Sequence, residues 1–420
     1  MIETLMLHPG VTLRCFRDSR FKHSCLSIQL VRPMRREEAA LNAILPAVLL
    51  RGCRNYPDLR AITLRLDDLY GASVSALVRR IGDYQTTGLY CSFMDERYAL
   101  DGDTILAPVI DLLRQLLLDP VTENGHFSAE IVESEKKNLI STIESELNDK
   151  RAYAAGQLLR AMCGSDSFGV PRLGDKENVA AIDADALFAH YQRILRESPV
   201  ELFYVGSAAS EEMAALLTPL FKTDETRDPL PPQTPFHACE GQHLSETMDV
   251  TQAKLCMGFT TPITNRSAEF AAMQVFNTLY GAGMTCKLFM NVREKLSLCY
   301  AIGSGYYGSK GILTVSAGID TDKDEVARQE IFRQLEACRT GDFTAQELEA
   351  AKEAIVSSVR AVHDAPGTIE AYYSTAALSG ARLSLADYRA AVENTTAEQV
   401  AEAARSVQLH SSFILKGVTA

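Results

Sequence analysis

The chain has 420 residues, 46% of them hydrophobic, and a formal net charge of −12, so its length predicts two or more domains with ordinary globular cores. The acidic balance and the lack of any Lys/Arg block exclude an extended phosphate-binding field and argue against a nucleic-acid partner. The first residues have no basic leader, and no uncharged apolar run reaches about 18 residues, so we expect a soluble, cytoplasmic protein without a membrane partner.

Three regular elements are predicted early in the chain. Residues 24–31 alternate apolar and polar side chains, which is typical of a half-buried strand. Residues 39–50 are apolar nearly all round, which predicts a buried helix. Pro46 lies inside this stretch, and because a mid-helix proline costs roughly 3 kcal/mol, we expect a kink or a new segment there. Residues 87–93, TGLYCSF, show a second strand pattern.

The two halves of the chain repeat each other. Three pairs of segments match in the same order with offsets of 210 to 216 residues: LDDLYGAS (66–73) with FNTLYGAG (276–283), the helical stretches 127–149 and 343–364, and ELFYVG (201–206) with SFILKG (412–417). Such an ordered set is hard to obtain by chance, so we infer two homologous halves of about 200 residues each.

The order of elements predicts the fold class. Each half runs through strands, a helix, more strands, a long helical stretch and a closing strand, which is α+β rather than strictly alternating βαβ. Residues 222–250 contain DPLPPQTP and little periodicity, which predicts an exposed linker. The predicted domains are therefore residues 1–221 and 251–420, and we expect these two halves to face each other across a cleft.

The stretch from Leu279 to Ala301 carries the densest set of signals. It opens with Gly281 and Gly283, whose missing Cβ atoms allow backbones to approach closely. Arg293 and, seven residues later, Tyr300 offer a guanidinium fork and a phenol that can bind the carbonyls of an extended peptide. The structural alternative is an exposed helix arginine and a half-buried strand tyrosine. A helical stripe is predicted between the glycines and the tyrosine, formed by Leu288, Phe289, Val292 and Leu296.

Other motifs are set aside. The segment from Gly303 to Gly308 satisfies G-x-G-x-x-G, but a strand pattern follows where a dinucleotide site needs a helix, so a hairpin is expected. His237, Cys239 and His243 are a weak metal set, and no G-x-S-x-G elbow or P-loop occurs. The ten cysteines are scattered without C-x-x-C, which favours reduced core thiols over disulfides or zinc.

The double repeat, the glycine turn and VREKLSLCYA, with Arg293 and Tyr300 seven apart, resemble the insulinase/pitrilysin peptidase family, which includes the mitochondrial processing peptidase. The resemblance covers nearly the whole chain. It implies that each half is an α/β roll with a mixed, largely antiparallel sheet and helices on one face, and that the halves form a clam shell. In catalytic members the first half carries H-x-x-E-H, whose histidines bind zinc and whose glutamate activates water.

This chain departs from the family at the zinc positions. Aligning Gly52 with the family glycine places Ala43, Pro46 and Ala47 where His, Glu and His are expected. Neither alanine nor proline has a side-chain lone pair for a metal or a proton. Ile143 falls on the expected third ligand, with Glu144 beside it. The resemblance therefore implies no intrinsic catalytic residue, no metal and no cofactor, with zinc expected only in a partner subunit.

The second half keeps the family's substrate-binding element. Arg293 and Tyr300 fall on the Arg/Tyr pair, and Gly281 and Gly283 fall on the glycine-rich loop. The resemblance implies a non-catalytic subunit that binds a peptide or unfolded polypeptide and pairs with an H-x-x-E-H subunit, or forms a homodimer in isolation. Among bacterial members the chain is similar to the pseudo-peptidase associated with 5-aminopentanol modification of elongation factor P (EF-P). The alternatives are a scaffold or binding protein of the same fold and, less favoured, an active zinc peptidase.

Overall fold

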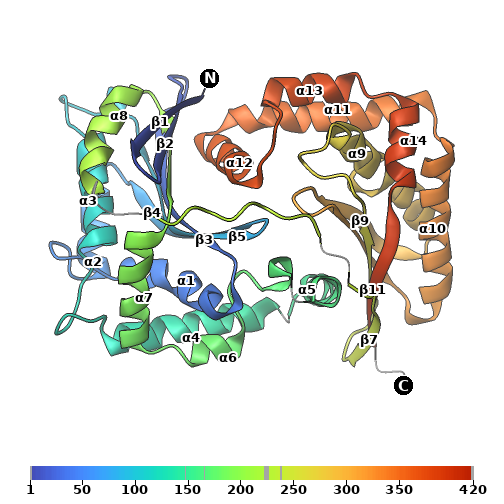
Figure 1. Ribbon diagram of the computed structural model, residues 1–420, viewed down its shortest axis with the longest axis horizontal. Coiled ribbons are helices and arrows are strands. Elements are labelled where there is room, and N and C mark those ends of the chain that lie inside the picture. The colour runs from blue at the N-terminus through green and yellow to red at the C-terminus, as the bar shows by residue number, and fades with distance from the viewer. Residues whose placement is uncertain (1, 147, 165, 222–226, 237–238, 418–420) are drawn as a thin grey trace. The chain divides into compact units, whose positions relative to one another are not determined.

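The computed structural model describes residues 2–146, 148–164, 166–221, 227–236 and 239–417. The chain forms two compact units, and each unit contains one sheet (Figure 1). Unit 1 consists of Met1–Ile143, Val170–Pro232 and Val362–Leu378, and unit 2 of Glu144–Gly169, Gln233–Ala361 and Ser379–Ala420. Among the described residues, no helix is long and apolar enough to cross a membrane. His237, set aside above as a metal ligand, lies outside the described residues.

Unit 1 is built on a six-stranded sheet of order β1-β2-β6-β3-β5-β4. Only the β2–β6 pair is parallel, and the other four pairs are antiparallel. The strands are β1 (Ile2–His8), β2 (Val11–Arg17), β3 (His23–Pro33), β4 (Ser73–Ile81), β5 (Tyr84–Met94) and β6 (Val200–Gly206). The strands predicted at residues 24–31 and 87–93 are therefore confirmed.

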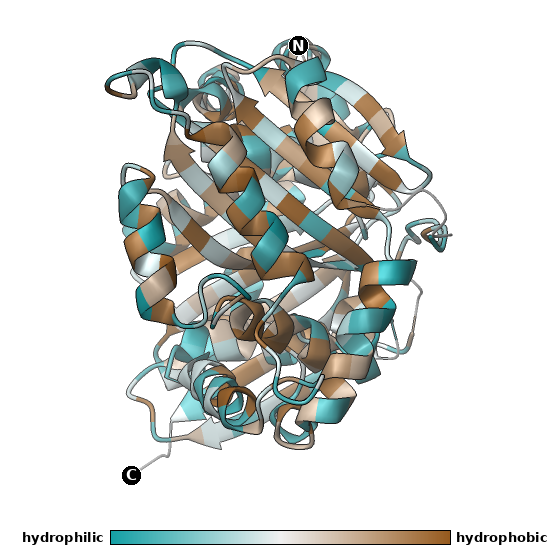
Figure 2. Cartoon of the chain, turned by 90° about the vertical axis from the view of Figure 1, so that its left-hand side faces the viewer, coloured by the Kyte–Doolittle hydropathy of each residue, from teal (hydrophilic) through white to brown (hydrophobic). Residues whose placement is uncertain are grey.

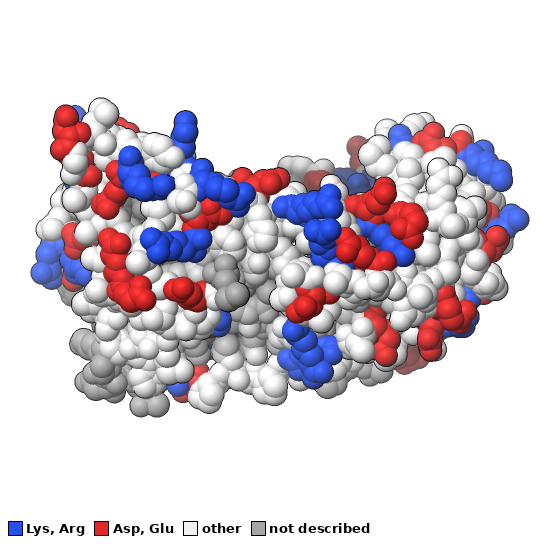
Figure 3. Space-filling view, turned by 90° about the horizontal axis from the view of Figure 1, so that it is seen from above, with Lys and Arg blue, Asp and Glu red and all other residues white. Residues whose placement is uncertain are grey.

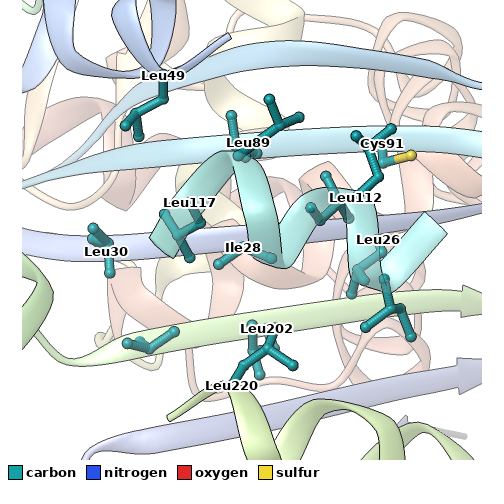
Figure 4. Close-up of a cluster of buried hydrophobic side chains, with 14 of the residues drawn as sticks. Leu26, Ile28, Leu30, Leu49, Leu89, Cys91, Leu112, Leu117, Leu202 and Leu220 are labelled. Atoms are coloured by element: carbon teal, nitrogen blue, oxygen red, sulfur yellow. The ribbon is translucent and has the colours of Figure 1, made fainter. Parts of the chain in front are cut away.

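Helices cover one face of this sheet and bury its apolar side chains. Figure 4 shows Leu26, Ile28 and Leu30 of β3 meeting leucines from α1 and α3. The hydropathy of the helices nearest the viewer in Figure 2 varies between hydrophilic and hydrophobic positions, as expected of helices that bury one side. The helices and short turns of unit 1 are α1 (Arg36–Leu49), α2 (Leu59–Asp68), η1 (Glu96–Tyr98), α3 (Leu106–Leu118), α4 (Ala129–Glu146), α6 (Lys176–Ala180), α7 (Ala184–Glu197), α8 (Ser210–Leu217), η3 (Thr218–Leu220), η7 (Val362–Asp364) and α12 (Pro366–Ser379).

Helix α12 comes from the second half of the sequence but packs on the opposite face of the unit 1 sheet. Its Ile369 joins Cys25 of β3 in one buried cluster, and its Leu378 joins Val31 in another. Ser27 and Gln29, which lie between these two positions on β3, have no exposed surface. The expectation of a half-buried β3 is therefore wrong, because a helix from a distant part of the sequence covers its polar face.

Helix α1 continues through Pro46 from Arg36 to Leu49, so of the two expected outcomes, a kink or a new segment, the new segment is wrong. The proline has no N–H to donate to the carbonyl of Asn42, four residues earlier. The hydroxyl of Thr87 on β5 donates to that carbonyl instead, at 2.7 Å. The neighbouring strand thus replaces the missing helical hydrogen bond, which removes part of the penalty for an internal proline.

Unit 2 repeats the sheet of unit 1. Its order, β7-β11-β8-β10-β9, is the order β2-β6-β3-β5-β4 of unit 1, and again only one pair, β7–β11, is parallel. The strands are β7 (His243–Met248), β8 (Ala253–Thr260), β9 (Cys299–Tyr307), β10 (Ile312–Ile319) and β11 (Gln408–Gly417). The predicted α+β fold with two homologous repeats and mixed, largely antiparallel sheets is confirmed, as is the hairpin expected at residues 303–308. β7 lies inside the stretch predicted as a linker, because pairing with β11 orders residues that have little periodicity of their own.

Helices pack on both faces of the unit 2 sheet. On one face Phe259 of β8 meets Phe332 of α10, with ring centroids 6.2 Å apart. On the other face α5 buries Leu158 and Met162 against Cys256 and Phe413. The helices and short turns of unit 2 are α5 (Lys150–Cys163), η2 (Ser167–Gly169), α9 (Phe270–Asn277), η4 (Thr278–Ala282), η5 (Leu288–Lys295), η6 (Thr321–Lys323), α10 (Asp324–Thr340), α11 (Ala345–Ala361), α13 (Leu385–Glu393) and α14 (Ala397–Arg405).

Candidate functional site

The segment that sequence analysis singles out forms three consecutive elements of unit 2. The helices η4 and η5 both have π-helical backbone geometry, and the edge strand β9 follows them. At the end of η5 the N–H of Leu296 donates to the carbonyl of Asn291, five residues earlier, at 3.2 Å. π-Helical segments are rare and occur frequently at functional sites. The unusual backbone therefore coincides with the predicted site.

Arg293 lies on η5 and is accessible. Its side chain is 41% exposed, and its guanidinium carbon sits 4.6 Å from the ring centroid of Phe289. Its ion pair with Glu294 is long, with 3.5 Å between Arg293 Nε and Glu294 Oε1. A guanidinium has five N–H donors, so this single loose contact leaves donors available to a ligand.

Tyr300 lies at the start of β9 and is 67% exposed. The β9–β10 register shifts there, since Gly318 pairs with Ala301 while Ile319 pairs with Cys299. Tyr300 is thus the extra residue of a β-bulge on an edge strand. Bulges in such positions re-aim a side chain and are enriched near active sites. The structure therefore presents the Tyr300 phenol to solvent through a local irregularity rather than within regular pairing.

The thiol of Cys299, next to Tyr300, is not a candidate nucleophile. Burial raises its pKa to about 11, and the positive charge of Arg293 opposes this rise only in part. The thiol is therefore protonated at neutral pH. The N–H of Leu298, the residue before Cys299, donates to the carbonyl of Val292 at 3.0 Å, which holds the end of η5 beside the start of β9.

Exposed apolar side chains are frequent in the segment that carries Arg293 and Tyr300. Fourteen large hydrophobic side chains are exposed in the described part of the chain, and four of them lie between residues 284 and 300: Met284 (79%), Met290 (48%), Leu296 (44%) and Tyr300 (67%). Leu296 belongs to the stripe predicted from a helical period, in which Leu288 and Val292 are fully buried and Phe289 is half-buried. The prediction that Leu296 shares their buried face is wrong. An accessible arginine among exposed apolar groups suits a polypeptide ligand.

The two predicted glycines differ in their surroundings. Gly283 is half-buried, and a Cβ added there would meet its nearest neighbour, the carbonyl oxygen of Thr278, at 3.4 Å. Gly281 is buried, and a Cβ there would lie 2.5 Å from Ser304 Oγ and 2.8 Å from Leu288 Cδ1. Gly281 therefore contacts the protein interior, whereas Gly283 lies nearer to solvent.

Comparison of the two units shows that residues 284–298 are an addition to the repeat. In unit 1 LDDLYGAS (66–73) leads directly into edge strand β4, which begins at Ser73. In unit 2 FNTLYGAG (276–283) is followed by η5, and the equivalent edge strand β9 begins only at Cys299. The sheet is complete without these additional residues in unit 1. They carry Arg293 and the exposed Met284, Met290 and Leu296, and they also bury Leu288 and Val292 in the interior of unit 2.

The zinc positions of the family do not fit a metal in this chain. Ala43 and Pro46 are buried in α1 and Ala47 is half-buried, so none offers a ligand atom. Ile143 packs against the apolar core of unit 1, and Glu144 is exposed on α4. Throughout the described ranges, no group of three or more His, Cys, Asp or Glu side chains could hold a metal ion. We therefore derive no catalytic step through zinc in this chain.

Beside these positions lies a buried polar network that the sequence did not signal. Asn42 of α1 donates to Gln85 at 2.9 Å, and its side-chain oxygen lies 2.7 Å from His190 Nε2. Arg193 donates to His190 Nδ1 at 2.9 Å. Burial, together with the charge of Arg193, lowers the pKa of His190 to about 4. His190 is thus neutral at physiological pH. Its hydrogen bond with Asn42 links α7 to α1, and the hydrogen bond from Asn42 to Gln85 links α1 to β5.

A groove of about 740 Å³ also lies in unit 2, between α9, α13 and α14. Small side chains such as Ala272 and Ala403 line it, and Glu269 and Glu402 stand among the lining residues. None of the predicted site residues is among them. The groove is therefore separate from the Arg293 and Tyr300 surface.

Known proteins resemble this chain along its whole length. Residues 181–355 match the family model described as the peptidase M16 inactive domain. A Bacillus subtilis protein named probable inactive metalloprotease YmfF is 31% identical over 412 residues, which cover 98% of this chain and 96% of that protein. A conserved protein from Enterococcus faecalis has the same fold, with a TM-score of 0.92, 26% identity and coverage of 100% of this chain and 99% of that one. A peptidase M16 inactive domain from Pseudomonas fluorescens, at 16% identity, superposes with a TM-score of 0.81 over 100% and 98% of the two chains.

Proposed function

Because this chain belongs to the M16, or insulinase/pitrilysin, peptidase family as an inactive homologue, we propose that it is the non-catalytic subunit of a composite peptidase. In this proposal a partner subunit supplies H-x-x-E-H and zinc, and this chain supplies half of the chamber together with Arg293 and Tyr300. The observation that carries the proposal is the exposed Arg293–Tyr300 surface on residues 284–300, while Ala43, Pro46 and Ala47 leave the zinc positions without ligand atoms.

The chemistry of the surface favours an extended peptide or an unfolded polypeptide as the ligand. Arg293 donates N–H groups and Tyr300 donates an O–H, and both match the carbonyl oxygens that an unfolded backbone leaves unpaired. The apolar neighbours Met284, Met290 and Leu296 can bind hydrophobic side chains of the same segment. On the face shown in Figure 3, the Lys/Arg and Asp/Glu residues of the described chain are interspersed, which gives no support to a nucleic-acid partner there.

In the composite site, the two side chains would act on the bound peptide while the partner activates water. Donors aimed at an oxygen that gains charge in the transition state lower the barrier, and removing one such donor costs about 10²-fold or more in kcat. A role in EF-P modification in the cytoplasm is the narrower form of this proposal. A scaffold of the same fold, without a proteolytic partner, is the competing function.

The test is co-purification with an H-x-x-E-H chain from the same organism, followed by cleavage of a disordered polypeptide. We expect Arg293→Ala to lower kcat about 100-fold and Tyr300→Phe to lower it about tenfold, as expected for lost transition-state donors. Arg389→Ala and Tyr98→Phe are the controls, because both residues lie outside the site and the Arg389 side chain, 42% exposed, matches Arg293 in exposure. An unchanged rate in the double variant Arg293→Ala/Tyr300→Phe refutes composite catalysis, and a stable complex that cleaves nothing favours the scaffold.

Metal analysis of the isolated chain tests the third possibility, an active zinc peptidase. We expect less than stoichiometric zinc after dialysis, since Ala43, Pro46 and Ala47 provide no ligands. One tightly bound zinc per chain, with peptide cleavage that a chelator abolishes, would overturn the proposal.

A further inference from the structure

Gly281 occupies the point at which the two elements of the candidate site meet. It is not one of the glycines with a positive φ in the described chain, so backbone conformation does not require it. The lack of space requires a glycine, because a Cβ at position 281 would lie 2.5 Å from Ser304 Oγ, 2.7 Å from Ser304 Cβ and 2.8 Å from Leu288 Cδ1. Ser304 belongs to β9, the strand of Tyr300, and Leu288 opens η5, the helix of Arg293.

Ser304 is itself held in place by a buried residue. Its hydroxyl donates to Asn277 Oδ1 at 2.7 Å, with the Asn277 carbonyl at 3.2 Å. Asn277 is the last residue of α9 and only 6% exposed. This hydrogen bond fastens β9, four residues beyond Tyr300, to the helix that leads into η4.

Leu288 connects Gly281 to the helix that carries Arg293. Its side chain is fully buried, and Arg293 lies five residues further on, which is one hydrogen-bonded repeat of a π-helix. A side chain at position 281 would therefore push against the strand of Tyr300 and the helix of Arg293 together. Buried elements in close contact shift as bodies rather than deform, because their packing is dense.

We propose that Gly281, Ser304 and Asn277 form a positioning cluster that sets the separation of Arg293 and Tyr300 for binding an extended polypeptide. This inference rests on the proposed function of the Arg/Tyr surface. It assigns Gly281 a role in the spacing of the site and leaves Gly283 as the glycine nearer to the ligand. The cluster acts through Arg293 and Tyr300 and touches no ligand itself.

The test compares two glycine variants that differ in available space. The readout is the Kd of the full chain for fluorescein-labelled casein, a disordered polypeptide. We expect Gly281→Ala to weaken binding at least about tenfold, because misplacing a binding group by a fraction of an ångström to 1 Å has effects of this size or larger. Gly156→Ala in α5, outside the site, is the control: its added Cβ meets nothing within 4 Å, so binding should stay within about twofold of the parent.

A second substitution that restores binding distinguishes a positioning role of Gly281 from a general loss of stability. In Gly281→Ala/Ser304→Gly the two contacts with Ser304 disappear, and only the flexible end of Leu288 remains close. We expect binding to recover at least about threefold relative to Gly281→Ala, and to stay weaker than that of the parent because the hydrogen bond to Asn277 is lost. Because the chain contains no tryptophan, Met290→Trp in each background gives a unique fluorophore on η5. Its emission should shift in Gly281→Ala and return in the rescued variant.

If Gly281→Ala fails to fold, Ser304→Ala tests the same cluster without adding an atom. It should weaken casein binding about threefold or more, with only a modest loss of Tm from the buried Asn277 oxygen that loses its donor. Parent-like binding by a folded Gly281→Ala or by Ser304→Ala overturns the cluster, as does a failure of Ser304→Gly to restore binding. Arg293→Ala distinguishes failure of the positioning cluster from failure of the proposed function. If Arg293→Ala weakens casein binding while the cluster variants do not, only the cluster is wrong. If Arg293→Ala binds casein like the parent, the proposed function is wrong.

Discussion

Removing Arg79 should destabilise unit 1 more than neutralising its partner Glu370. The carboxylate of Glu370, on α12, has no exposed surface and accepts from Ser27 Oγ at 2.7 Å, Gln29 Nε2 at 3.2 Å, Arg79 Nη1 at 3.0 Å and Arg79 Nη2 at 2.8 Å. The side chain of Arg79 is 28% exposed. One member of the pair thus retains access to water, and the other has none.

This difference in burial sets how much stability each substitution loses. Arg79→Met leaves a buried carboxylate with two neutral donors, and breaking a buried pair in this way costs about 3–5 kcal/mol. Glu370→Gln keeps an acceptor oxygen for Ser27, and water can solvate Arg79, so we expect about 1–2 kcal/mol. Arg79→Met/Glu370→Leu removes both charges and should be less destabilised than Arg79→Met alone.

Urea unfolding followed by circular dichroism measures these differences, and hydrogen exchange of α12 peptides localises them. Arg79→Met should raise exchange within residues 366–379 before it affects unit 2. Arg389→Met is the control, because its pair with Glu393 is exposed and worth less than about 1 kcal/mol. Equal losses for Arg79→Met and Glu370→Gln would show that burial of the carboxylate does not control the stability of this contact.

Three further predictions concern buried polar groups. Thr87→Val should lower the free energy of unfolding by about 1–3 kcal/mol, because the buried carbonyl of Asn42 loses its donor. In a Pro46→Ala background the same substitution should be nearly neutral, because the new N–H of residue 46 donates to that carbonyl. Urea unfolding of the double-mutant cycle measures both effects. Lys310→Met should cost about 3–5 kcal/mol because it strands the buried carboxylate of Asp166, 3.0 Å away, and Lys310→Met/Asp166→Leu should recover part of this loss in the same assay. Folding lowers the pKa of His190 from 6.5 to about 4, so its contribution to the free energy of unfolding is fully present above pH 6.5. Stability should fall by about 2–3 kcal/mol as the pH drops toward 4. His190→Gln should flatten this part of the plot of stability against pH.

The repeat and its elements could be predicted because they depend on local patterns. The matched segments 66–73 and 276–283 lie before equivalent edge strands, and the matched stretches 127–149 and 343–364 contain α4 and α11. Periodicity identifies such elements from neighbouring residues alone. The shared strand order then follows from the homology of the halves.

What the sequence did not reveal depends on contacts between distant segments. Nothing near Ser27 and Gln29 indicates that α12, more than 330 residues away, will cover them. Likewise α5 lies within the first half of the sequence but packs on the sheet of unit 2. Burial of a polar strand face is set by the partner helix, so a pattern confined to one strand predicts only half of its environment.

In the candidate site, the assumed α-helical period predicts the wrong burial for one residue, Leu296. With 3.6 residues per turn, Leu288, Val292 and Leu296 fall on one stripe and should all be buried. The structure buries the first two and exposes 44% of Leu296, which is the C-cap residue, so η5 ends before the predicted stripe does. The N–H of Leu296 donates to the carbonyl of Asn291, five residues earlier, and the N–H of Leu298 donates to the carbonyl of Val292, six residues earlier. Neither hydrogen bond joins residues four apart, as an α-helical period assumes, and no residue pattern in this segment predicts this. The burial of a residue at such an irregular helix end therefore depends on backbone geometry that periodicity alone does not contain.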